Sequence, residues 1–194
     1  MRFRSTALIT TAAIALTAVP ASAAEINTGG ENGAYHSTFC PALVNQLSRL
    51  GKPSDCVSSA GSGENLRRVA RNPLELGYGQ LDVFALEADR YGGEEAFDII
   101  RSDDVRECVF AVTRNRSYTN FGEIAVNADR LRFILPPEAS GSAKTFEYLR
   151  KIDPEGLGRA RNIINATDTD EAIRMTLADD QAVTFFVQFP DPAN

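Results

Sequence analysis

The sequence predicts an α/β protein made of two small lobes, each with a mainly parallel sheet flanked by helices. In the first half of the chain, a short apolar stretch, a glycine-rich or polar turn and an amphipathic stretch follow one another three times, over residues 26–50, 57–70 and 76–89. In the second half, apolar and amphipathic stretches alternate again. Strands that alternate with helices indicate right-handed β–α–β units, which build parallel sheets.

The start of the chain has the pattern of a secretory signal peptide over residues 1–23. Arg2 and Arg4 give it a positive end, residues 7–19 are apolar, and residues 21–23 (ASA) carry the small side chains that precede cleavage. The apolar stretch is too short and too rich in alanine and threonine to anchor the chain in a bilayer. We therefore expect cleavage after residue 23, or one residue later, and an exported chain that is not membrane-embedded.

The first lobe is expected to span residues 24–112. Its first helix begins at Ser37 or Thr38, tolerates Pro41 in its first turn, and ends where Gly51 and Pro53 follow. Expected strands cover residues 26–28, 56–59, 74–78 and 107–113, and further helices cover residues 62–70, 80–91 and 96–100.

The second lobe is expected to span residues 113–194, after a polar turn at residues 114–120. The last helix covers residues 169–177, with Thr167 or Asp168 as its N-cap and Glu171 near its start, as in a capping box. The other expected elements are strands at residues 131–135, 161–165 and 182–189 and a helix at residues 142–151.

Composition excludes several classes of function. The formal net charge is −6 and no basic cluster occurs, which argues against nucleic acid or anionic lipid as a partner. His36 is the only histidine, and residues 60–63 (AGSG) lack the first glycine of a nucleophile elbow. Residues 141–145 (GSAKT) lack the glycine that precedes lysine in a phosphate-binding loop. We expect no enzymatic activity and no cofactor, and the scattered cysteines have no metal-ligand spacing.

Three cysteines remain in a chain expected to enter an oxidising compartment. A helix from Cys40 to Leu50 rises about 15 Å, and an extended return to Cys56 covers a similar distance. This favours a Cys40–Cys56 disulfide. Two buried free thiols, or a reactive Cys40 near a helix start, are the alternatives.

Several turns place backbone N–H groups at expected helix starts, where the helix dipole favours an anion. Hydroxyl, amide and aromatic side chains accompany these turns, so a small anionic molecule is the expected ligand. The alternative is that the same residues form ordinary turns and N-caps. The expected ligand-binding residues are Thr28, Gly29, Gly30, Tyr35, Ser62, Asn65, Gln80 and Ser142.

Three motifs in the first lobe occur in the order of a known family. Residues 28–30 (TGG) lead into residues 33–35 (GAY), residues 61–66 read GSGENL, and residues 76–82 read LGYGQLD. The chain resembles the TAXI-type solute-binding subunits of tripartite ATP-independent periplasmic (TRAP) transporters in these motifs. In the second lobe, residues 140–142 (SGS) echo the family's Gly-Ser-Gly turn less closely.

The resemblance implies a type II periplasmic-binding-protein-like fold, hinge closure around a small, carboxylate-bearing organic anion in the periplasm, and delivery to the transporter's membrane subunits. It also implies that the eight residues given above contact the ligand. Thr184 stands where the family has an aspartate, and the family pattern continues beyond Asn194, so an abbreviated second lobe is expected. The alternative function is an exported sensor-input or protein-interaction module on the same fold, without a role in transport.

Overall fold

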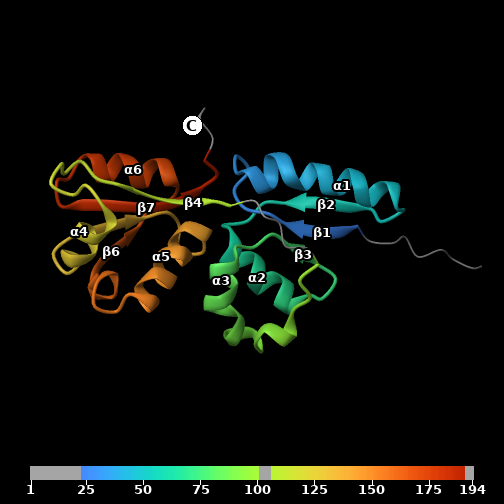
Figure 1. Cartoon of the computed structure of the whole chain (residues 1–194). Coiled ribbons are helices and arrows are strands. Elements are labelled where there is room, and N and C mark those ends of the chain that lie inside the picture. The colour runs from blue at the N-terminus through green and yellow to red at the C-terminus, as the bar shows by residue number, and fades with distance from the viewer. Residues whose placement is uncertain (1–22, 101–105, 191–194) are drawn as a thin grey trace, which may run out of the picture.

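The structure, a computed structural model, describes residues 23–100 and 106–190 and shows an α/β protein with two separate sheets flanked by helices (Figure 1). Most of the strand pairs are parallel. Residues 1–22 of the expected signal peptide lie outside the described residues. No helix in the described ranges is both long and apolar enough to cross a membrane.

The first sheet has three parallel strands in the order β2-β1-β3. They are β1 (Ala24–Asn27), β2 (Ser54–Val57) and β3 (Leu76–Gly77). Figure 1 shows α1 on one side of this sheet and α2 and α3 on the other. These helices span Cys40–Arg49, Ser62–Arg71 and Leu81–Glu87, and one turn of π-helix (Tyr35–Phe39) precedes α1.

A disulfide joins the start of α1 to β2, which confirms the expected cysteine pair. Cys40 and Cys56 are bonded, with their Cα atoms 6.0 Å apart, and Cys40 is fully buried. Cys108 is a half-buried free thiol. The disulfide fixes the helix against the edge strand of a small sheet.

The second sheet has four strands in the order β4-β7-β5-β6. They are β4 (Cys108–Val112), β5 (Arg132–Leu135), β6 (Asn162–Asn165) and β7 (Ala182–Gln188). β7 pairs antiparallel with β4 and parallel with β5. Helix α6 (Thr169–Leu177) covers one side, and α4 (Phe121–Val126) and α5 (Gly141–Ile152) lie on the other (Figure 1).

Two expectations need correction. β4 belongs to the second sheet, because Cys108 pairs with Gln188 and Val112 with Thr184, so the sheets separate before β4 and not between residues 112 and 113. Below, the first lobe is the first sheet with its helices, and the second lobe begins at β4. No helix forms at residues 96–100. The chain makes a short 3-10 turn at Glu94–Ala96 and then extends, since Phe97 packs edge-on against Phe84 of α3.

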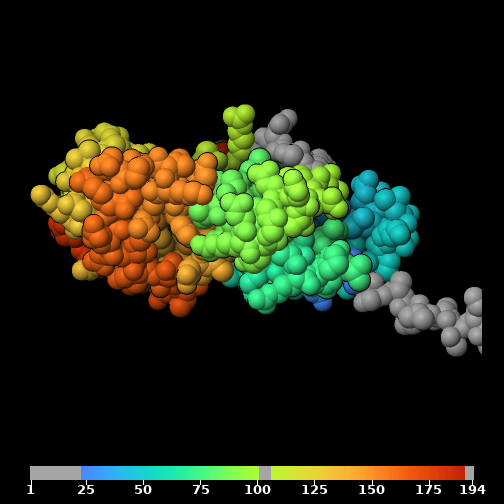
Figure 2. Space-filling view, turned by 90° about the horizontal axis from the view of Figure 1, so that it is seen from below, coloured from blue at the N-terminus to red at the C-terminus, as the bar shows by residue number. Residues whose placement is uncertain are grey.

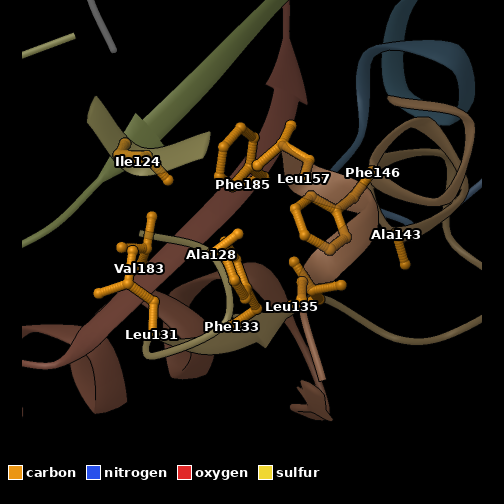
Figure 3. Close-up of a cluster of buried hydrophobic side chains, with 11 residues drawn as sticks. Ile124, Ala128, Leu131, Phe133, Leu135, Ala143, Phe146, Leu157, Val183 and Phe185 are labelled. Atoms are coloured by element: carbon orange, nitrogen blue, oxygen red, sulfur yellow. The ribbon is translucent and has the colours of Figure 1, made fainter. Parts of the chain in front are cut away.

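The main apolar core lies within the second lobe (Figure 3). Phe133 of β5, Phe146 of α5 and Phe185 of β7 form its centre, with ring centroids 4.9 to 6.1 Å apart. All buried residues of this cluster come from residues 124–185. Burial of these side chains stabilises the second lobe by itself, without apolar side chains from the first.

Candidate functional site

The two lobes meet where helices from each of them begin. Gly61, the N-cap of α2, has a φ of 125° and lies against the start of α5. A Cβ on Gly61 would lie only 2.9 Å from the Gly141 nitrogen. Gln80, the N-cap of α3, fills the space beside Gly141, and its Oε1 accepts a 3.3 Å hydrogen bond from Ser62 Oγ. We call Gly61, Ser62, Gln80 and Gly141 the inter-lobe junction.

The N-termini of α2 and α5, which meet at the junction, differ in their capping. Ser140 caps α5, since its Oγ accepts a hydrogen bond from the Ala143 nitrogen at 3.2 Å. No side chain in the described part of the chain caps the start of α2. Free N–H groups of a first helical turn give that end a positive potential. The junction therefore combines a capped helix start with an uncapped one.

A carboxylate that the sequence analysis missed lies at this junction. Glu107 Oε2 accepts a 2.7 Å hydrogen bond from Gln80 Nε2, and the Tyr35 hydroxyl also donates to Glu107. Burial raises the pKa of Glu107 above its ordinary value and the nearby Asp82 raises it further, while the bond from Gln80 acts in the opposite direction. No feature of the sequence pattern singled out Glu107, because its position depends on how the chain crosses between the lobes.

An aromatic cluster adjoins Glu107. Tyr35 stacks on Tyr78 with ring centroids 5.1 Å apart, and Phe189 meets Tyr35 and Phe39 edge-on at 6.0 and 5.6 Å. Burial and the neighbouring Glu107 raise the pKa of Tyr35 well above its ordinary value. Tyr35 therefore stays a neutral hydrogen-bond donor.

Asn65 and Thr28 are used inside the first lobe. The Asn65 Nδ2 donates to the carbonyl oxygens of Thr28 (2.8 Å) and Tyr78 (2.9 Å), and its Oδ1 accepts from Ser59 Oγ. Thr28 Oγ1 donates to the Val57 carbonyl and lies 2.8 Å from His36 Nδ1. Both side chains are buried, so they hold the ends of the first sheet's strands together.

The remaining expected residues lie in two places. Ser142 is on α5 directly after Gly141, and its Oγ accepts a 2.9 Å hydrogen bond from the Val187 nitrogen. Gly29 and Gly30 border open space, because a Cβ on either would have no heavy atom within 4 Å. Of the eight expected residues, the structure thus brings Tyr35, Ser62, Gln80 and Ser142 to the contact between the lobes.

A second feature of the boundary is a charged cavity of about 380 Å³. It opens between α2, the end of α3 with its following 3-10 turn (Ala88–Tyr91), and the start of α5. None of the eight expected residues lines it. Its charged lining residues are Glu64, Arg67, Glu87, Arg90, Glu138 and Lys144.

No protein-family model, curated protein or solved structure matches this chain. The resemblance to TAXI-type subunits therefore stays a prediction based on the motifs.

Proposed function

We propose that the chain is an exported solute-binding protein with a type II periplasmic-binding-protein-like fold. It captures a small, carboxylate-bearing organic anion between its lobes and delivers the anion to the membrane subunits of a transporter. Export is supported by the Cys40–Cys56 disulfide, since such bonds persist in oxidising compartments.

One observation carries the proposal: the starts of α2 and α5, from different lobes, meet at the junction, and α2 has no side-chain cap there. In the described arrangement the two helix starts touch, so a ligand carboxylate enters when the lobes move slightly apart and then accepts hydrogen bonds from both of them. Binding and closure are then a single equilibrium, as in hinge-closing proteins.

Glu107 supports the choice of a carboxylate ligand. Its own carboxylate accepts hydrogen bonds from Gln80 and Tyr35, so these donors are already arranged for this chemical group. In the ligand complex, the incoming carboxylate takes these donors and Glu107 either moves out or is protonated. The raised pKa of Glu107 favours protonation.

The same contact also favours the second candidate, a sensor-input or protein-interaction module that needs no ligand. Because Glu107 satisfies Gln80 and Tyr35 internally, the closed arrangement is complete without a bound anion. The two candidates differ in whether any small acid stabilises the protein.

A thermal-shift screen of the mature protein against amino acids, dicarboxylates and keto acids separates them. A ligand present at about 100 times its Kd stabilises the folded protein by about 2.7 kcal/mol, which is a readily measured shift in Tm. A Tm that no compound in the panel raises would favour the interaction module.

Once a ligand is found, two variants test whether it binds at the inter-lobe junction. Ser62→Asp places a negative charge at the junction and is expected to abolish binding. Ser117→Asp adds the same charge at an exposed position in the second lobe and is expected to leave the Kd unchanged. Unchanged affinity in Ser62→Asp, with the fold intact by circular dichroism, would place the ligand elsewhere.

A further inference from the structure

The contact between α3 and α5 is polar, unlike the interior of the second lobe, and the lobes also touch through Phe189, which packs on Tyr35 and Phe39. Thr145 of α5 donates a hydrogen bond to Asp82 of α3, and Gln80 lies against Gly141. The two apolar clusters in the described residues contain no residue of the first lobe. Polar contacts of this kind are typical of lobes that move relative to one another. Figure 2 shows α5 (orange) directly against the green surface of the first lobe.

A closed ring of four charged side chains crosses this contact. Glu87 and Arg90 come from the first lobe, and Lys144 and Glu147 come from α5 of the second. Lys144 Nζ lies 3.0 Å from Glu87 and 2.9 Å from Glu147, whereas Arg90 lies 2.9 Å from Glu87 and 3.7 Å from Glu147. Each acid therefore has two cations and each cation has two acids.

The ring is buried at one end and exposed at the other. The side chains of Glu87 and Lys144 are 4% and 12% exposed, whereas those of Arg90 and Glu147 are 57% and 38% exposed. Removal of Lys144 leaves the buried Glu87 with only the largely exposed Arg90 as its cation, which disfavours the closed arrangement. The exposed pair of Arg90 and Glu147 is weaker than the buried pair of Glu87 and Lys144, and salt screens it.

We infer that the ring formed by Glu87, Arg90, Lys144 and Glu147 is a reversible, salt-sensitive latch that holds the two lobes closed. The inference does not depend on the proposed ligand.

The arrangement within each lobe makes the latch reversible. Glu87 and Arg90 are three residues apart on one lobe, and Lys144 and Glu147 are three residues apart on the other. When the lobes separate, each acid keeps a cation of its own lobe. Opening therefore breaks the two cross-lobe pairs without leaving an isolated charge in the protein.

Small ions can reach the ring. Glu87, Arg90 and Lys144 line the charged cavity of about 380 Å³ between the lobes. Dissolved salt ions that enter this cavity compete with the cross-lobe pairs. At an ionic strength of about 1 M the Debye length falls to about 3 Å, so the exposed pair contributes little.

Pulsed electron spin resonance between labels on the two lobes tests the latch. Labels at Lys52→Cys and Lys151→Cys, both exposed positions, are placed in a Cys108→Ser background with the native disulfide intact. At low salt the wild-type ring is expected to give one distance population. Lys144→Gln is expected to add a longer distance and to raise the open fraction by about tenfold or more. High salt is expected to produce the same longer distance with the ring unmutated.

Asp180→Asn is the matched control, because it removes an ion pair with Arg114 that lies on the surface within the second lobe. Its distances are expected to match those of the unmutated ring. If Lys144→Gln does not fold, Glu147→Gln, at a half-exposed position, replaces it and is expected to add the same longer distance. The proposal is contradicted if folded Lys144→Gln or Glu147→Gln keeps the single distance that the wild type shows at low salt. It is also contradicted if high salt leaves that distance unchanged in the wild type.

Discussion

Gly61 and Gly141, from different lobes, approach so closely that a Cβ on Gly61 would lie 2.9 Å from the Gly141 nitrogen. Neither position leaves room for a side chain in this arrangement, since a Cβ on Gly141 would overlap the Gln80 amide. The closeness of the two lobes therefore depends on glycine at position 61, where a Cβ would meet backbone atoms, whereas at position 141 it would displace the Gln80 side chain.

Gly61→Ala is expected to open the contact between the lobes and to destabilise the protein. Gly93 is a matched control: both glycines have a positive φ with an extended ψ, which strains alanine by about 1–3 kcal/mol. A Cβ on Gly93 meets no heavy atom within 4 Å, so only Gly61→Ala adds a clash. Urea unfolding is expected to show a further loss of about 1 kcal/mol or more for Gly61→Ala. Equal losses would mean that the lobes adjust freely.

Asn65→Ala is expected to lower the free energy of unfolding by about 1–3 kcal/mol. The substitution leaves the carbonyl oxygens of Thr28 and Tyr78 without the donor that satisfies them now. Asn162→Ala changes an exposed asparagine of β6 and is expected to cost less than about 0.5 kcal/mol. Similar values for both variants would contradict the role given to Asn65 in joining the strand ends.

Replacing both Cys40 and Cys56 with serine is expected to destabilise the first lobe by about 3 kcal/mol, because the bond closes a loop with a sequence separation of 16. Cys108→Ser serves as the control, since this thiol is free. The comparison is made by urea unfolding under non-reducing conditions. A loss in the double variant no larger than in Cys108→Ser would show that the disulfide does not stabilise the fold.

Glu107 is expected to make the protein less stable as the pH rises. Burial and Asp82 raise its pKa in the folded state, so the folded state binds the proton more tightly than the unfolded state does. Its stabilising contribution is fully present below the ordinary glutamate pKa of about 4.3 and is lost as the pH rises through the folded value.

Glu107→Gln is therefore expected to unfold at higher urea concentration than the wild type at neutral pH, with a smaller difference at mildly acidic pH. Glu94→Gln removes the same charge from an exposed position and checks for a general effect of net charge. A Glu107→Gln variant whose midpoint follows the wild type across this pH range would contradict the assigned burial.

Local patterns in the sequence were sufficient for elements that depend on nearby residues. Helix α6 has the expected bounds and begins after Asp168, one of the two expected N-caps, which accepts a hydrogen bond from the Glu171 nitrogen. The Cys40–Cys56 pair followed from the lengths of one helix and its return. The three glycine-containing turns of the first lobe also precede helices in the order expected, although β2 and β3 are shorter or shifted.

Features that depend on distant contacts were missed. The apolar residues of β4 predict a strand but not its partner, and the structure pairs it antiparallel with β7, far along the chain. The short helix α4 was not predicted, because six residues give too little periodicity. Glu107 lacked any motif, and its place beside Gln80 and Tyr35 is fixed only when both lobes are assembled.

The position of β7 in the second sheet has a consequence for the order of folding. β7 lies between β4 and β5, although the ribosome makes it after the other strands of the two described sheets. During synthesis the first sheet has all three of its strands early, whereas the second sheet lacks its bridging strand until β7 is made. A nascent chain that stops before residue 182 therefore leaves β4 and β5 with exposed edges, which makes truncated products prone to aggregation.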